Sequence, residues 1–240
     1  MLSELRPIHF STELVIPPLN LSTHEAQERH RSRIKQVFQT LRDQKGIDFN
    51  KVDVDTLRGP HLVTRAASGH VKSYAFLASS IRAVDERTER TLDEFAHEVQ
   101  EVVSVSFTVL RIPIIMVQSC VIRATVKPYG YNDARDFLFH HGLGLPGRQV
   151  VEQFGRPAAV AGMRITFPPL ANTPNEHRVR IESYGRDPSL LFLEVMSIFP
   201  KTPIAAPQLD RIVTHFEECY AFLEERVCPF VDSLAGTSGA

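Results

Sequence analysis

The chain of 240 residues is long enough for one large domain or two small ones with a sizeable core. Its 43% hydrophobic and 23% charged residues are the ordinary balance of a globular protein. The 27 Lys and Arg nearly cancel the 28 Asp and Glu, and this balance argues against nucleic-acid binding, which usually requires a basic surface.

Cysteine usage and hydropathy bear on the compartment. The chain contains three cysteines without zinc-like spacing: Cys120, Cys219 and Cys228. This odd number predicts neither a disulfide framework nor a zinc site, and it suits a reducing compartment. The first ten residues lack the apolar run of a signal peptide, and the most apolar stretch, residues 105–122, is interrupted by Arg111 and Pro113. We therefore expect a cytoplasmic protein that does not enter a membrane.

The first predicted elements are a strand and a helix. Hydrophobic residues alternate at the start of residues 8–18, which predicts a strand that ends at a pair of prolines. Hydrophobic residues then recur at helical spacing, with Gly46 as the terminator. Ser22 and Glu25 predict a capping box at the start of this helix.

The rest of the first half is predicted to contain short strands and a second helix. Three extended runs are separated by turn sequences: residues 49–55, 61–66 and 71–79. A second capping pattern, Thr91 with Glu94, begins a helix with one hydrophobic side. Pro113 ends this helix because it cannot continue the hydrogen bonding.

The second half repeats this order of elements. Residues 114–128 predict a strand, and residues 131–141 predict a short helix capped by Asn132. A long helix begins at about Pro207, and Pro229 bends or ends it. Between these helices lie three strand-like runs: residues 162–169, 176–185 and 190–200.

The predicted fold is therefore α+β, with two similar halves that each contain a strand, a helix, three strands and a helix. The halves span residues 1–112 and 113–234, and residues 235–240 are predicted to be a disordered tail. No residue-level repeat accompanies this order, so the internal duplication rests on element order alone. The alternation in the strands favours mostly antiparallel sheet packed against helices.

The stretch HHGLGLPGRQ, residues 140–149, has the G-x-G-x-x-G spacing of dinucleotide-binding loops. Such a loop requires a strand before it, a helix that begins at its end, and an acidic residue about 20 positions later. Here a predicted helix precedes the loop, residues 160–170 contain no carboxylate, and Pro146 removes a backbone donor. The stretch therefore predicts a helix end followed by a turn, and no cofactor.

Other residue types typical of catalytic or metal sites are present without the spacing that such sites require. His140 and His141 are predicted at a helix end, where adjacent side chains point about 100° apart and would not bind one metal ion. Cys120 and Cys228 are predicted to be small buried hydrophobic residues. Four glutamates are predicted on the exposed side of the last helix: Glu217, Glu218, Glu224 and Glu225. We assign no catalytic residue and no metal ligand.

Arginines gather on one predicted sheet face of the second half. If the strands alternate and are neighbours, that face carries Arg123, Arg164, Arg178 and Arg180, with Glu182 and Glu194 as counter-charges. One interpretation is a solvent-exposed face with cross-strand ion pairs. The other is a polar floor that binds an anionic ligand or an acidic partner segment, because guanidinium groups suit carboxylate and phosphate.

Three stretches carry a resemblance that covers most of the chain: VIRATVKPYG, MRITFPP and LDRIVTHFEECYAFLEERVCPFV. In this order they resemble a sporadically distributed bacterial family of uncharacterised proteins of similar length. The resemblance implies an α+β fold and supplies no activity. Duplicated strand–helix–strand–strand modules are also similar, at the level of the fold, to the ligand-binding domains of some transcriptional effectors.

These observations favour a cytoplasmic, non-enzymatic protein-interaction or assembly module that binds a protein partner or forms a homo-oligomer. The alternative is a protein that binds a small anionic ligand in a groove between the two halves, over the arginine-bearing sheet face. An enzyme of unrecognised type is the third alternative, and no cofactor is expected.

Overall fold

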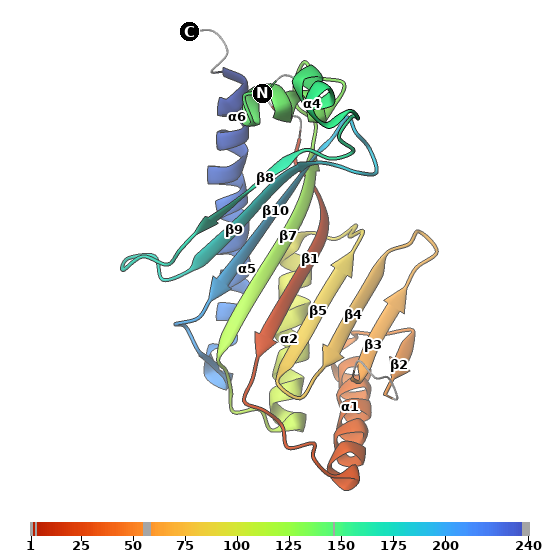
Figure 1. The fold of residues 1–240 in the computed structure, drawn as a ribbon. Helices are drawn as coiled ribbons and strands as arrows, with labels where there is room; N and C mark the ends of the chain where they lie inside the picture. Colours follow the sequence, from red (N-terminus) through yellow and green to blue (C-terminus); the bar gives the residue numbers. More distant parts are fainter. Residues whose placement is uncertain (1, 3, 55–58, 146, 237–240) are drawn as a thin grey trace.

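The chain forms one large sheet with its longest helices on one face (Figure 1). The computed structural model describes residues 1–240 except residues 1, 3, 55–58, 146 and 237–240. Every strand pairing in the sheet is antiparallel. The predicted α+β class with antiparallel sheet and packed helices is therefore confirmed.

Both halves of the chain contribute strands to this sheet. The first half contributes β1 (Arg6–Val15), β2 (Lys51–Asp53), β3 (His61–Arg65), β4 (Val71–Phe76) and β5 (Ser80–Glu86). The second half contributes β7 (Val117–Val126), β8 (Gly162–Phe167), β9 (Glu176–Ser183) and β10 (Leu191–Phe199). The strand order is β2-β3-β4-β5-β1-β7-β10-β9-β8. A separate two-stranded sheet pairs β6 (Ile114–Ile115) with β11 (Ile204–Ala205).

The three longest helices, α1, α2 and α5, lie on the same face of the sheet (Figure 1). The α-helices are α1 (His24–Lys45), α2 (Leu92–Leu110), α3 (Ala134–Phe137), α4 (Gly147–Phe154), α5 (Arg211–Phe222) and α6 (Cys228–Gly236). Two π-helical turns, Leu138–Gly142 and Leu223–Val227, follow α3 and α5, and a 3-10 turn, Ala206–Gln208, precedes α5. Among the described helices, none combines the length and the apolar character that crossing a membrane requires.

Helix α1 ends as predicted but begins one residue later than predicted. Gly46 adopts the left-handed conformation of a C-cap, with φ 66°. The N-cap is Thr23, whose hydroxyl accepts a hydrogen bond from the Ala26 amide at 3.2 Å. The predicted cap, Ser22, is wrong because its hydroxyl instead donates to the Asn20 side chain at 2.7 Å.

The capping box of α2 is confirmed. The Glu94 amide donates to the Thr91 hydroxyl at 3.2 Å, and the Thr91 amide donates to the Glu94 carboxylate at 2.8 Å. The cap of α3 is Asp133 and not the predicted Asn132. The Asp133 carboxylate accepts from the Arg135 amide at 2.8 Å and also pairs with the Arg135 guanidinium, so one acidic side chain satisfies two donors.

The first half contains one strand more than predicted. Residues 71–79 were expected to form one strand, but β4 ends at Phe76 and the chain turns back into β5. Strand β5 pairs with both β4 and β1, so it connects the outer strands to the middle of the sheet. Its sequence, SIRAVDE, has an acidic residue on the buried face, which obscures the alternation.

The two halves share one sheet, because β1 pairs with β7 along its length. The predicted boundary between residues 112 and 113 falls between α2 and β6. In each half the first strand pairs with the last strand, β1 with β5 and β7 with β10, and the earlier strands continue outwards. The two halves therefore have the same pairing of first and last strands as well as a similar order of elements. The internal duplication itself stays a prediction.

The hydrophobic core also joins the halves. Phe95 of α2 stacks on Phe10 of β1 with ring centroids 5.7 Å apart, and it meets Phe216 of α5 edge-to-face at 5.4 Å. All three rings are fully buried. Helix α2 of the first half is therefore packed between the central strand β1 and the last long helix of the chain.

The last helix continues beyond Pro229, which was predicted to bend or end it. The π-helical turn Leu223–Val227 comes first, and Pro229 lies in the first turn of α6, where a missing amide proton is tolerated. Helix α6 ends at Gly236, so residues 235 and 236 of the predicted tail are helical. Residues 237–240 of that tail lie outside the described residues.

Candidate functional site

The sheet face that the helices leave uncovered, here called the open face, carries the polar side chains of the second-half strands. In β7, Cys120, Ile122 and Ala124 are fully buried beneath the helices. Val121 and Arg123 alternate with them and are half-buried on the open face. The predicted alternation of β7 is therefore confirmed.

Strand register places three of the predicted arginines in one row across the open face. Arg123 of β7 lies opposite Glu194 of β10, which lies opposite Arg180 of β9, which lies opposite Arg164 of the edge strand β8. The Arg123 Nε atom donates to the Glu194 carboxylate at 2.6 Å. The row thus alternates in charge over its first three positions.

The remaining predicted residues, Glu182 and Arg178, lie on the same face beside this row. The Glu182 carboxylate is 2.5 Å from the Arg180 guanidinium and 3.7 Å from that of Arg164. Arg178 pairs with Glu176 at 2.5 Å. Exposed ion pairs contribute only about 0–1 kcal/mol each. All five predicted residues therefore share one face, and their role in binding an anion stays a prediction.

A groove of about 530 Å³ lies where the two halves meet at the open face. Arg123 is the one predicted site residue among its lining residues. Three further arginines line it: Arg6 at the start of β1, Arg87 just after β5, and Arg186 in the turn between β9 and β10. Sequence reasoning missed these three because side-chain alternation applies inside strands and not at their ends or in turns.

A buried histidine forms part of the groove wall. His9 is 4% exposed, and its Nδ1 atom lies 3.0 Å from the Glu86 carboxylate, while its Nε2 atom lies 2.8 Å from the Ser11 hydroxyl. Burial lowers the pKa of His9, and this effect outweighs the neighbouring Glu86 charge, which raises it. Glu86 is also 3.9 Å from the Arg123 guanidinium, so the groove contains a linked set of polar side chains.

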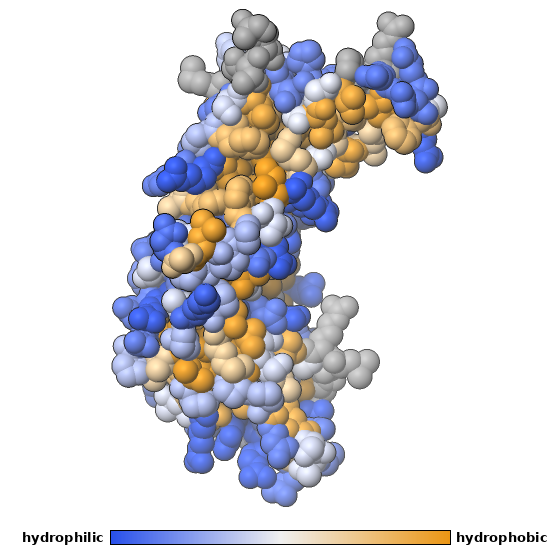
Figure 2. Space-filling view, turned by 60° about the vertical axis from the view of Figure 1, so that its left-hand side comes forward, coloured by the Kyte–Doolittle hydropathy of each residue, from blue (hydrophilic) through white to orange (hydrophobic). Residues whose placement is uncertain are grey.

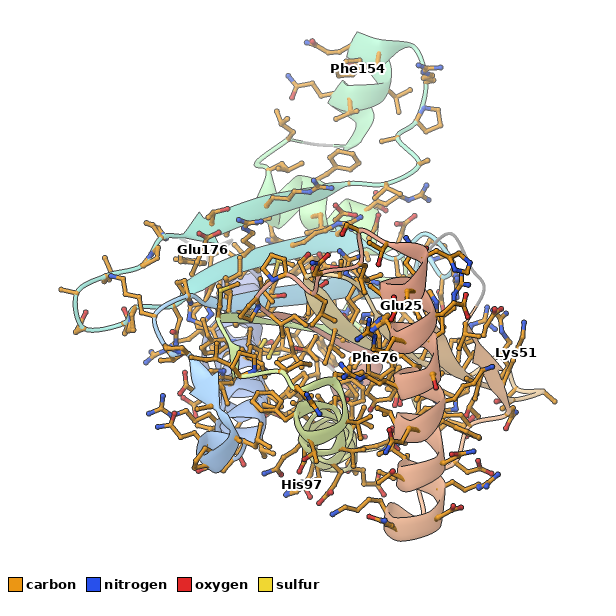
Figure 3. All side chains as sticks on the ribbon, turned by 90° about the horizontal axis from the view of Figure 1, so that it is seen from below. Glu25, Lys51, Phe76, His97, Phe154 and Glu176 are labelled. Carbon is orange, nitrogen blue, oxygen red and sulfur yellow. The ribbon has the colours of Figure 1, made fainter. Side chains whose placement is uncertain are left out.

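A second exposed feature is the segment between the π-helical turn and β8, here called the arm (residues 143–145 and 147–161). Figure 2 shows it reaching out from the body, with hydrophobic side chains along it and a hollow beneath it. In Figure 3, Phe154 on the arm and His97 on α2 lie on opposite sides of the sheet, so the arm stands on the open-face side. Five large hydrophobic side chains of the arm are 41–75% exposed: Leu143, Leu145, Val151, Phe154 and Val160.

The glycine-rich stretch within residues 140–149 connects two helical segments. The π-helical turn Leu138–Gly142 includes its first three residues, and Gly144 adopts a left-handed φ of 63°. The amides of Leu143 and Leu145 donate to the carbonyls of Leu138 and Phe139 at 2.9 and 2.8 Å. Gly142 and Gly147 flank this turn, and Pro146 lies outside the described residues. The predicted helix end and turn is therefore confirmed.

The predicted environments are confirmed for Cys120, which is buried, and for the paired glutamates, but Cys228 is only half-buried. Burial raises the pKa of the Cys219 thiol to about 12 and that of Cys228 to about 11, and it raises the pKa of Cys120 as well. These thiols remain protonated and poorly nucleophilic at neutral pH. Glu217, Glu218, Glu224 and Glu225 are exposed. Within the described ranges, no group of three or more His, Cys, Asp or Glu side chains could hold a metal ion.

The two adjacent histidines lie in the π-helical turn Leu138–Gly142. His140 is exposed, and the His141 Nε2 atom is 2.5 Å from the Tyr131 hydroxyl. Burial lowers the pKa of His141. Their rings meet edge-to-face with centroids 4.7 Å apart, in a small aromatic cluster with Phe137.

In comparisons with known proteins, no protein-family model and no curated protein matches the sequence.

Proposed function

We propose that this protein is an assembly module that binds a second copy of itself through the arm and the edge strand β8. The observation that carries the proposal is the exposure of hydrophobic side chains on the arm. Soluble monomers rarely display a contiguous hydrophobic patch of this kind without a binding partner.

The arm contains a helix that is too short to be stable by itself. Helix α4 spans eight residues, and isolated helices shorter than about 12–15 residues are marginal in water. Phe154 is 75% exposed and Val151 is 41% exposed, one turn apart on the same side. A helix that buries so little of its hydrophobic side is expected to be covered in the working assembly.

The edge strand beside the arm supports the same proposal. Among the described strands, β8 pairs only with β9, so its other edge has unpaired amides and carbonyls over six residues, with Arg164 as its single charge. Long edge strands with few charges are ready to pair with another chain. The opposite edge strand, β2, has three residues, two of them the charged Lys51 and Asp53, and is better protected.

Two-fold symmetry brings these two features together. Pairing of β8 with β8 of a second copy about a two-fold axis is antiparallel, and it uses the same patch on both copies. The arm precedes β8 directly, so it would lie beside the C-terminal end of the second β8. The loop that follows that end carries Leu170, which is 61% exposed. Stable interfaces bury about 1,200–2,000 Å² in total, more than one short strand pair supplies, so the arms would add the remaining area.

Sedimentation velocity of the purified chain over about 1–100 µM tests this proposal. We expect the wild type to shift towards twice the chain mass as its concentration rises. Val151→Ser with Phe154→Ser should weaken the dimer at least tenfold, because both side chains leave the interface. Thr166→Lys, on the exposed edge of β8, should also weaken it, because edge lysines oppose strand pairing.

Tyr129→Ser is the matched control, because Tyr129 is 81% exposed and lies outside the arm. This variant should associate as the wild type does. A chain that stays monomeric over the whole concentration range would overturn the proposal, and so would equal weakening by the arm variant and Tyr129→Ser.

A further inference from the structure

The groove between the halves contains three guanidinium groups that lack acidic partners. Arg6, Arg87 and Arg186 come from three separate segments and line the same groove. Among the described residues, none of the three forms an ion pair, whereas Arg123 beside them pairs with Glu194. Unpaired arginines that converge from different segments are the side chains best suited to bind carboxylate or phosphate, because their planar forks match both groups.

Two of the acidic residues in the groove are already engaged. Glu86 contacts His9 at 3.0 Å and Arg123 at 3.9 Å. Asp187 accepts hydrogen bonds from the Ser189 amide at 2.9 Å and the Ser189 hydroxyl at 2.7 Å, and these bonds lower the pKa of Asp187. The third acid, Glu89, is exposed, so the four arginines still leave the groove with an excess of positive charge.

The backbone departs from regular strand geometry at Arg87 and at the neighbouring part of β1. Arg87 adopts a left-handed φ of 53°, which is uncommon for a residue other than glycine. Its amide donates to the Ile8 carbonyl at 2.9 Å, at the point where the β1–β7 register shifts between Pro7 and His9. A Cβ atom on Gly69 would collide with the Arg87 guanidinium, so this glycine leaves room for the side chain. Strained residues and bulges of this kind cluster at binding sites.

One wall of the groove is aromatic. Tyr184 and Phe192 line the groove, and their rings are nearly parallel, with centroids 6.2 Å apart and an interplanar angle of 9°. Phe192 lies opposite Glu182 in the β9–β10 register, so Arg180 and Tyr184 flank it on either side. The Arg180 guanidinium is 5.3 Å from the Phe192 ring centroid, which holds this ring in place.

We propose that this groove binds a small molecule in which a carboxylate or phosphate group is attached to a flat ring. The anionic group contacts Arg6, Arg87 and Arg186, and the ring lies against Tyr184. The volume of about 530 Å³ lies within the roughly 300–1,000 Å³ typical of small-molecule sites. This ligand site is separate from the arm and from β8, so it does not depend on the proposed self-association.

Isothermal titration calorimetry of the full chain at fixed ionic strength tests the site with four probes. Phenyl phosphate and benzoate carry both the ring and the anion, inorganic phosphate carries the anion alone, and benzyl alcohol carries the ring alone. We expect one saturable site for phenyl phosphate or benzoate, with at least tenfold weaker binding of the two single-group probes.

Two triple variants then identify the arginines. Arg6→Gln, Arg87→Gln and Arg186→Gln together should weaken binding of phenyl phosphate or benzoate at least tenfold. The matched control removes the same charge at three exposed arginines outside this groove and outside the predicted arginine cluster: Arg42→Gln, Arg65→Gln and Arg82→Gln. The control should change the affinity less than threefold, and thermal melting of both variants verifies that they are folded.

Three outcomes would overturn the proposal. The first is the absence of saturable binding by any probe up to about 10 mM. The second is equal weakening by the two triple variants, which would indicate a general effect of surface charge. The third is equal affinity for inorganic phosphate and phenyl phosphate, which would remove the role of the aromatic wall.

Discussion

Replacement of Phe95 with Ala tests whether the two halves of the chain form one cooperative core. The Phe95 ring is fully buried between Phe10 of the central strand and Phe216 of the last long helix. Truncation of a buried Phe to Ala costs about 3–5 kcal/mol of unfolding free energy. Two aromatic contacts are lost together, at about 0.5–1.5 kcal/mol each beyond area burial, so we expect a value near the upper end of that range.

The assay is denaturant unfolding of the full chain, followed both by far-UV circular dichroism and by tyrosine fluorescence, since the chain contains five Tyr and no Trp. We expect one transition that both probes report, shifted to lower denaturant in the Phe95→Ala variant with little change in slope. The control is Phe230→Ala, because Phe230 is 39% exposed, and it should cost much less. Two transitions, of which Phe95→Ala shifts only one, would refute the shared core.

Other predictions concern a histidine, a helix cap and a turn. His215 is 4% exposed, with its ring nitrogens hydrogen-bonded to Gln118 and Thr202, and burial lowers its pKa to about 4. The unfolded chain binds this proton more tightly, so stability should fall by about 3 kcal/mol as the pH drops from about 6.5 towards 4, and His215→Gln should flatten this dependence in pH-resolved denaturation. Thr91→Ala removes the capping box of α2 and should cost about 0.5–2 kcal/mol by the same denaturation assay, and no change would contradict the cap. Gly144→Ala should cost about 1 kcal/mol in thermal melts because φ is 63°, and unaltered stability would contradict the assigned turn.

Much of the fold follows from side-chain periodicity, because the sheet is covered on one face only. In β10 the buried and half-buried residues alternate without a break from Leu191 to Phe199. The same half-covered arrangement gives α1 and α2 one hydrophobic side each, with buried residues at helical spacing. Periodicity therefore predicted most of the long elements in their order and placed Arg123 and Arg180 on the open face.

Strand β5 could not be predicted in this way, because its buried face carries a charge. Asp85 is completely buried, with the His70 Nε2 atom 2.8 Å from one carboxylate oxygen and the Arg90 guanidinium 3.6 Å from the other. A buried carboxylate is tolerated only when such partners are present. His70 is 15 positions away, just before β4, and local sequence patterns cannot indicate that these two side chains meet.

The groove was missed for a related reason. The predicted arginines lie inside strands, where position along the strand decides which face a side chain occupies. Arg6, Arg87 and Arg186 lie at a strand start, after a strand end and in a turn. The pairings of β1 with β5 and β7, and of β7 with β10, bring the ends of these segments together, and they join residues 65 to 119 positions apart.

The way in which the halves join accounts for both proposed sites. Because α1, α2 and α5 pack on one face, the opposite face of the β1–β7 junction is left for the groove. The same arrangement leaves β8, three strands from β7, as an unpaired edge next to the arm. Between the two sites lie Arg180, Glu182 and Arg164, whose ion pairs are partly exposed and therefore weak. The groove and the edge are thus physically separate surfaces of one sheet, and ligand binding and self-association are expected to respond to different substitutions.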